Sequence, residues 1–198
     1  MSTRQEGYAS GRARKERILE AAVAAFGASG FEHATLTDIA TACGVSRQGL
    51  LHHFASKEEL LTAVLQRRDD TDRRSFDAAL ANNRTPSEAL AEIIADNAQS
   101  PTVMRLYTVL SAEATNPDHA AHDYFAALYT RLRAQLTEAI ATAQDAGDAP
   151  SGLPPETFAT LLLAIKDGLA LQALLSPGEV DPVRTIRELT AALEGAGR

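Results

Sequence analysis

The chain has 198 residues, of which 45% are apolar, and it carries a formal net charge of −7 and a single cysteine. No segment approaches the roughly 18 consecutive apolar residues of a membrane span, and no apolar segment follows the charged N-terminus, as it would in a secretory signal. One cysteine excludes an internal disulfide framework and favours a reducing compartment. We therefore expect a cytoplasmic protein with no membrane partner.

The charge is unevenly divided along the chain. Residues 1–57 hold seven lysines or arginines and five acidic residues, a charge of +2, so the remainder carries −9. Contacts with phosphate need positive charge only where the phosphate lies. The division predicts a nucleic-acid-binding N-terminal part joined to an acidic part with another task, and it argues against a nonspecific nucleic-acid coat.

The first predicted element is a helix from Arg12 to Ser29, preceded by a flexible tail over residues 1–11. Apolar residues recur along it at helical spacing, as expected of a helix that packs on a core. These residues are Ile18, Leu19, Ala22, Ala25 and Phe26. The string Ser29-Gly30-Phe31 is expected to end the helix.

A helix-turn-helix is predicted over about residues 35–54. Thr35 can cap its first helix, Gly44 allows the left-handed conformation that often ends a helix, and Ser46 can cap the second. Ser56 and Glu59 have the spacing of a capping box for a third helix. Two short helices around a glycine turn, the second with an exposed polar first turn, are typical of DNA readers. The chain is therefore predicted to bind double-stranded DNA.

The second half is marked by capping residues followed by proline, which is tolerated at the first position of a helix. The predicted helices run near 86–99, 101–114, 117–146, 155–175 and 182–194. The charged segment from Gln66 to Arg74 is interpreted as a solvated connector. No alternating strand pattern is present. The sequence therefore predicts an all-α protein of roughly nine or ten helices.

The N-terminal motifs resemble those of the TetR (tetracycline-repressor) family of bacterial transcriptional regulators. The matching residues are Ile18-Leu19-Glu20-Ala21-Ala22, Phe26, Gly30-Phe31, Thr35, Asp38-Ile39-Ala40, Gly44-Val45-Ser46, His53-Phe54 and Ser56-Lys57-Glu58-Glu59-Leu60-Leu61. The resemblance implies a three-helix DNA-binding domain over residues 12–71 and a helical effector-binding and dimerisation domain over residues 72–198. It also implies repression that is relieved by a small molecule.

The residues expected to contact DNA lie in and around the helix-turn-helix. They are Thr37, Ser46, Arg47, Gln48, Gly49, Leu51, His52, His53 and Lys57. Arg47 suits the paired acceptors of guanine and Gln48 the edge of adenine, although ordinary solvated residues would also fit these places. Lys57 and His53 are expected to contact phosphate.

The presumed recognition helix departs from the family pattern, which commonly reads Gly-Thr-Leu-Tyr before the His-Phe pair. Here Gly49 lacks a side chain and Leu51 lacks a hydroxyl, so base readout is expected to fall on Arg47 and Gln48. Leu51 is expected to pack on a thymine methyl. Upstream, Arg12, Arg14 and Lys15 either follow the DNA or simply form a soluble helix start.

A homodimer is predicted through the last two helices, because apolar residues in 155–175 face more than one side. The residues assigned to this interface are Phe158, Leu161, Leu162, Ile165, Leu169, Val183, Ile186 and Leu189. The alternative is that all of them belong to the core of one chain.

A small-molecule pocket is predicted between the helices of 86–146 and the helix of 155–175, because aromatic residues gather there with a few polar groups. The residues assigned to the pocket are Met104, Tyr107, His122, Tyr124, Phe125, Tyr129 and Asp167. Plain core packing is the alternative for each of them. The acidic surroundings predict a largely apolar occupant that is neutral or cationic.

Enzyme chemistry is not predicted, because the chain has no phosphate-binding glycine loop, nucleophile elbow or metalloprotease pair. No cofactor or metal is expected: His119 and His122 are interpreted as pocket or surface residues rather than metal ligands, and Cys43 as a small buried residue. The predicted function is a ligand-responsive repressor on a palindromic operator. The alternative is a DNA-binding regulator or adaptor without a small-molecule effector, controlled by a protein partner.

Overall fold

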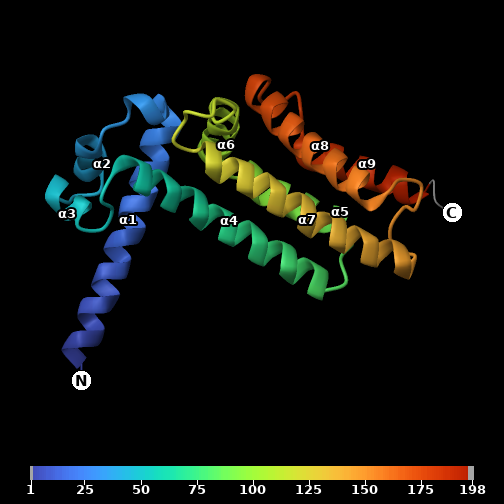
Figure 1. Cartoon of the computed structure of the whole chain (residues 1–198), viewed down its shortest axis with the longest axis horizontal. Coiled ribbons are helices and arrows are strands. Elements are labelled where there is room, and N and C mark those ends of the chain that lie inside the picture. Colours follow the sequence, from blue (N-terminus) through green and yellow to red (C-terminus); the bar gives the residue numbers. More distant parts are fainter. Residues whose placement is uncertain (1, 196–198) are drawn as a thin grey trace.

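The computed structural model describes the backbone of residues 2–195 and the side chains of residues 11–193. Within that part every regular element is a helix, which confirms the all-α prediction (Figure 1). The helices are α1 (Ser2–His33), α2 (Leu36–Ala42), α3 (Arg47–Leu51), α4 (Lys57–Ala81), α5 (Pro86–Ala98), α6 (Pro101–Glu113), α7 (His122–Ala146), α8 (Pro155–Leu175) and α9 (Pro182–Gly195).

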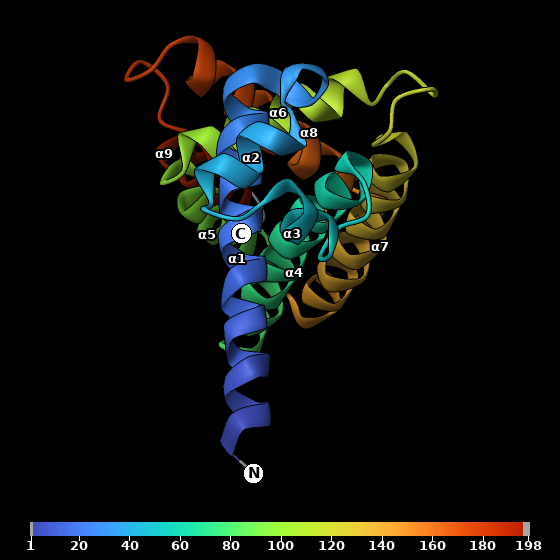
Figure 2. The same ribbon diagram turned by 90° about the vertical axis from the view of Figure 1, so that its left-hand side faces the viewer.

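Helix α1 is longer than the sequence predicted. It begins at Ser2 rather than Arg12, so residues 2–11 are helical where a flexible tail was expected, and Met1 lies outside the described residues. No proline interrupts this segment, and its two glycines disfavour a helix by only about 1 kcal/mol each. The predicted break is confirmed at Gly30, whose φ of 79° and ψ of 165° are not helical. The N-terminal end of α1 projects away from the other helices (Figures 1 and 2).

Proline starts α5, α6, α8 and α9 as predicted, and Thr85 and Glu88 form a complete capping box on α5. The prediction of a helix start at Pro117 is wrong, because α7 begins only at His122. Side chains instead stabilise a turn before α7: Asn116 Oδ1 accepts from the Asp118 N–H at 3.1 Å, and His119 Nδ1 accepts from the Ala121 N–H at 3.2 Å. Such local bonds compete with helix formation.

Two apolar cores share the long helices between them. The first joins α1–α4 to α6 and to the start of α7, and Leu106, Leu110 and Phe125 belong to it. The second joins α5, α8 and the rest of α7 to Phe76 of α4 and Ile186 of α9. The first core therefore continues across residue 71, the predicted boundary between the two domains.

Helices α1 and α6 are in close contact at Gly27. A Cβ atom at this position would lie 2.7 Å from Thr102 Cγ2 and 3.0 Å from the Thr102 carbonyl oxygen. Both separations are shorter than van der Waals contact. The missing side chain thus allows α1 to rest directly on the helix that carries Met104 and Tyr107.

Replacing Gly27 by alanine is expected to destabilise the fold by about 1–3 kcal/mol, because overpacking a close helix contact forces the two backbones apart. The matched control is Gly11→Ala in the same helix, where a Cβ would meet nothing within 4 Å. That change should be neutral or stabilising by up to about 1 kcal/mol. Urea unfolding of both variants measures the difference, and equal stabilities would contradict the close-contact explanation.

Candidate functional site

Local hydrogen bonds set the geometry of the helix-turn-helix. Thr35 caps α2 by accepting from the Asp38 N–H at 3.1 Å, and Ser46 caps α3 by accepting from the Gly49 N–H at 3.0 Å. Between them Gly44 has a φ of 69°, and the Val45 N–H donates to the Ala40 carbonyl at 3.0 Å. These bonds satisfy helix-end groups and fix the angle between α2 and α3.

The polar residues assigned to DNA lie on the outer side of this unit. Thr37 of α2, Arg47 and Gln48 of α3 and His52 after it are exposed, while Leu50 faces inward and is fully buried. The capping residue Ser46 is also exposed, whereas Gly49 and Leu51 within α3 are half-buried. Figure 2 views the molecule from this side, with α2 and α3 toward the reader. The first turn of α3 therefore offers an arginine and a glutamine to a partner.

Basic groups from α1 gather beside the end of α3. The Lys15 ammonium lies 5.5 Å from the centre of the Phe54 ring. Partial burial lowers the pKa of His53, and the nearby charges of His52, Arg14 and Lys15 lower it further. The lowered pKa keeps His53 mostly neutral at pH 7, so its ring can donate a hydrogen bond without carrying a full charge. This grouping supports the reading in which Arg14 and Lys15 follow the DNA.

Lys57 occupies a different environment from the one the sequence suggested. Its ammonium donates to the carbonyl oxygens of Phe31 at 2.9 Å and Glu32 at 3.2 Å, and it lies 4.4 Å from the centre of the Phe31 ring. Two of its three N–H groups are thereby engaged inside the molecule. Lys57 holds the end of α1 against the start of α4, which leaves at most one donor for a phosphate.

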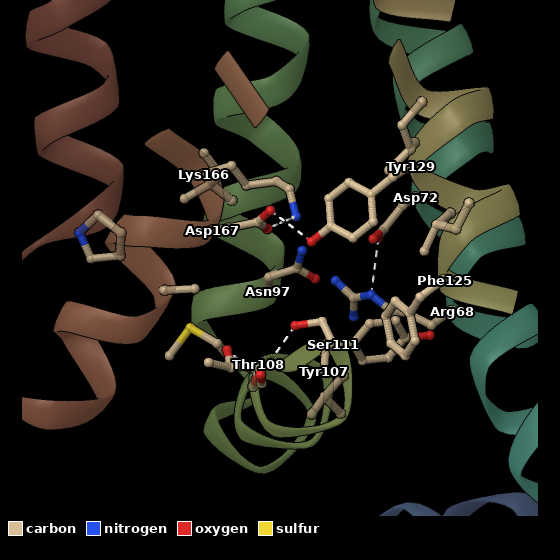
Figure 3. Close-up of a pocket in the computed structure, with 17 residues that line it drawn as sticks. Arg68, Asp72, Asn97, Tyr107, Thr108, Ser111, Phe125, Tyr129, Lys166 and Asp167 are labelled. Carbon is tan, nitrogen blue, oxygen red and sulfur yellow. Dashed lines mark hydrogen bonds and ion pairs between the residues drawn. The ribbon is translucent and has the colours of Figure 1, made fainter. Parts of the chain in front are cut away.

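A cavity of about 110 Å³ lies in the acidic part, with walls from α4, α5, α6, α7 and α8 (Figure 3). Five of the seven residues assigned to a pocket line it, namely Met104, Tyr107, Phe125, Tyr129 and Asp167. Most of the exposed wall is apolar, and the polar groups are few, as in ordinary small-molecule sites. The structure thus brings residues from α6, α7 and α8 together as predicted.

Two residues assigned to the pocket lie elsewhere. His122 Nδ1 lies 2.8 Å from the Ala114 carbonyl in the turn before α7, and the Tyr124 ring packs edge-on against Phe125 with the ring centres 5.7 Å apart. His119 packs against Phe31, with the ring centres 6.0 Å apart. Among the described residues, no three metal-ligating side chains gather. Both histidines make contacts within the turn before α7 and at the start of that helix.

Arg68, Asp72 and Lys166 also line the cavity, although none of them was predicted to. Arg68 and Asp72 belong to the segment from Gln66 to Arg74, interpreted above as a solvated connector. Most of this segment is exposed, but the interpretation is wrong for Arg68 and Asp72, whose side chains are only 19% and 28% exposed. A signal for Lys166 was present in the sequence. Lys166 and Asp167 are an isolated charged pair within the apolar run from Phe158 to Leu175.

The charges in the pocket wall are paired with one another. Arg68 Nε lies 3.0 Å from Asp72 Oδ1, and Lys166 Nζ lies 2.6 Å from Asp167 Oδ1. Tyr129 also donates to Asp167, at 2.7 Å. Burial raises the pKa of Asp72 despite the opposing charge of Arg68. Burial also raises the pKa of the Tyr129 phenol, and Asp167 raises it further, so this phenol stays protonated. The wall carries two cations and two acids, so of the expected neutral or cationic occupants the local charge favours a neutral one.

The dimer prediction needs revision at individual residues. Phe158, Leu162, Leu169 and Ile186 are buried within this chain, so their side chains are not free to meet a second copy. Ile165, Val183 and Leu189 are half-buried against the second core. Of the eight assigned residues only Leu161 is largely exposed, at 44%.

A different side of α8 is uncovered and apolar. This face, called the α8 face below, consists of Leu161, Ala164, Gly168, Leu171 and Leu175. The spacing of these residues places them on one side of a helix. An 18-residue window of α8 reaches a mean hydropathy of 1.6 with only 28% of it buried, so α8 is long and apolar enough to span a membrane by composition alone. The charged pair Lys166 and Asp167 near its middle favours a protein partner instead.

Known proteins resemble the chain over almost its whole length. Residues 18–64 match the model for bacterial regulatory proteins of the tetR family, and residues 85–197 match that for the C-terminal part of BetI-type transcriptional repressors. The HTH-type transcriptional regulator SrpR of Pseudomonas putida is 27% identical over 162 residues, which are 82% of this chain and 76% of SrpR.

Solved structures share the fold. A putative transcriptional regulator from Saccharomonospora viridis in complex with choline has a TM-score of 0.72 and 24% identity, covering 90% of this chain and 93% of that one. A complex of SmeT with triclosan has a TM-score of 0.77 and 23% identity, covering 91% of this chain and 90% of that one. Sequence identities at this level establish a common fold. They do not carry the ligand of one protein over to another.

Proposed function

This chain belongs to the TetR family of bacterial transcriptional regulators, and from that premise we propose that it is a dimeric repressor released from its operator by a small molecule. The observation that carries the proposal is the course of α4. This helix follows directly after α3 and continues to the cavity, where it supplies Arg68 and Asp72 to the wall. A molecule in the cavity therefore touches the same rigid element that positions the recognition helix.

Three contacts along α4 support this coupling. At its start Lys57 holds the carbonyls at the end of α1, and near its middle the Leu65 carbonyl accepts from the Tyr107 hydroxyl at 2.7 Å. One turn further on, Arg68 reaches the cavity. A ligand that moves Tyr107 or Arg68 shifts α4 relative to α1, and α3 moves with it. To change operator occupancy from nearly full to nearly empty, the ligand must prefer the released form by roughly 5 kcal/mol.

Two copies of the chain are needed for this readout. A two-fold dimer through the α8 face would present two α3 helices to successive major grooves, about 34–36 Å apart, on a palindromic operator. Solved relatives with choline and triclosan support a small molecule as the effector class, without indicating which one. We place this activity in the cytoplasm, where the chromosome of a bacterium lies.

Selection of bound sequences from random DNA tests the proposal, and it is expected to return a palindrome with two short half-sites. Arg47→Ala should weaken binding to the selected site by roughly 1–3 kcal/mol and relax preference at one base pair in each half-site. The control is Arg105→Ala. This change also removes an exposed arginine, but from α6, outside the helix-turn-helix. Unchanged base preference in the Arg47 variant would show that α3 does not read DNA through this residue.

A further inference from the structure

Arg68 has an unused hydrogen-bond donor in the wall of the cavity. Its Nε pairs with Asp72 at 3.0 Å, but its Nη2 is buried and has no partner. A buried charged donor without an acceptor is unfavourable, and nearly all such groups in folded proteins are paired. The position therefore suits an acceptor brought by a bound molecule.

Asn97 supplies the complementary group from α5. The Asn97 side chain lies near Asp72, where it helps to hold the pKa of that carboxyl down against burial. The amide oxygen, Oδ1, is the acceptor of this side chain. This Oδ1 is likewise buried without a partner. Figure 3 shows the Arg68 guanidinium and the Asn97 amide entering the same space from opposite walls.

The unpaired donor of Arg68 and the unpaired acceptor of Asn97 indicate which ligand group would pair with both. A hydroxyl oxygen can accept from Arg68 Nη2 while its hydrogen is donated to Asn97 Oδ1. A methyl group of similar size satisfies neither atom, and an ether oxygen satisfies only Arg68. The hydroxyl is the smallest group that pairs both.

The charge of the wall selects against ions. Asp72 and Asp167 each already face a cation, at 3.0 Å and 2.6 Å. A carboxylate or an ammonium ion on the ligand would add a charge without a free counter-charge in a largely apolar site, which is costly. A neutral molecule avoids this cost.

The size of the space suits a small apolar body. A volume of about 110 Å³ is comparable to that of dry protein cavities that accept a single benzene ring. Met104, Phe125 and Leu128 line the space with flat or flexible apolar surface. One ring with small substituents fits this volume.

We propose that the pocket binds neutral, hydroxylated single-ring molecules, with the hydroxyl placed between Arg68 and Asn97. This inference rests on the proposed ligand-controlled function and specifies the class of its effector. It also assigns Arg68 and Asn97 as the residues that distinguish a hydroxylated ligand from an apolar one of the same shape.

Calorimetry on the full-length protein without DNA tests the ligand class. The probes share one body and differ in one group: p-cresol, p-xylene, 4-methylanisole, 4-methylbenzoate and 4-methylbenzylamine. We expect p-cresol to bind at least tenfold more tightly than p-xylene, since two buried hydrogen bonds distinguish them, with 4-methylanisole between them. Equal affinity for p-cresol and p-xylene, tighter binding of either ion, or binding of no probe would overturn the proposal.

Two substitutions locate the hydroxyl. In Asn97→Leu and Arg68→Met the preference for p-cresol over p-xylene should fall to less than threefold. Arg105→Met, which removes an exposed arginine of α6 outside the cavity, should keep the full preference. The ratio of the affinities for p-cresol and p-xylene is measured within one variant, so it does not depend on how stable that variant is. The wild-type probe series tests the ligand class without any substitution. An undiminished ratio in both pocket variants would overturn the assignment.

Operator release is measured separately with the same probes. If p-cresol binds with the expected preference but leaves the operator complex intact, the ligand class stands and the proposed release mechanism fails. If apolar or charged probes release the operator and p-cresol does not, the release mechanism stands and the ligand class fails.

Discussion

Leu171→Glu is expected to convert the protein to monomers and to weaken operator binding by at least 100-fold. Leu171 is 47% exposed in the middle of the α8 face, where Leu161 and Leu175 are also uncovered. A buried carboxylate facing its own copy across a two-fold axis would be desolvated and repelled. A monomer has only one helix-turn-helix. It therefore loses the gain in affinity that comes from linking two binding modules, about 10²–10⁴-fold.

Sedimentation at micromolar concentration measures the oligomeric state of the Leu171→Glu variant, and operator titration measures its affinity for DNA. Val109→Glu is the matched control, because Val109 is similarly exposed at 41% but lies on α6 rather than α8. The control should remain a dimer with normal affinity. If Leu171→Glu stayed dimeric, the copies would have to meet through another surface. If the wild type were itself a monomer, the dimeric repressor would be excluded.

Lys57→Met is expected to lower the free energy of unfolding by about 2 kcal/mol, the usual size of lost hydrogen bonds to a charged group. The substitution removes the ammonium that joins the Phe31 and Glu32 carbonyls. It also removes the cation from the Phe31 ring, worth about 0.5–1 kcal/mol at a partly exposed site. DNA binding should weaken because the helix-turn-helix loosens on α1.

Urea unfolding and the salt dependence of operator binding separate this role from a phosphate contact. A residue that only bound phosphate would leave stability unchanged and reduce the salt slope by about one unit. Arg12→Met serves as the control, since Arg12 is an exposed cation of α1. Its stability should equal that of the wild type. An equally stable Lys57→Met protein with a flatter salt dependence would restore the original interpretation of Lys57.

The parts of the fold that local chemistry determines could be predicted from the sequence. Thr35, Gly44 and Ser46 act within three or four residues of themselves, so their spacing indicated the helix-turn-helix without knowledge of the core. The proline starts of α5, α6, α8 and α9 are local in the same sense. At Asn116-Pro117 the same pattern failed, because the bonds that hold the turn involve His119 and the backbone beyond it.

The candidate sites depended on packing between distant segments, which a single sequence does not contain. Helix α8 has apolar residues on several sides, and only the position of α7 and α9 shows that Leu162 and Leu169 face inward while Leu171 faces out. Arg68 and Asp72 have the spacing of a surface ion pair on an exposed helix. Their burial follows from the helices that close over them, and only that closure turns them into pocket residues.

The first apolar core joins α1–α4 to Leu106, Leu110 and Phe125. This core limits how freely the N-terminal DNA-binding domain can be moved to another protein. A fragment ending near residue 71 would expose the surface that these three side chains cover, so it should not fold as a free-standing module. Grafting the domain onto another scaffold would require the recipient to supply an α6 with matching apolar residues and a partner for Gly27 as close as Thr102. Exchange of this N-terminal domain between proteins during evolution is constrained in the same way. The domain and the α6 helix on which it rests must be inherited together or change together.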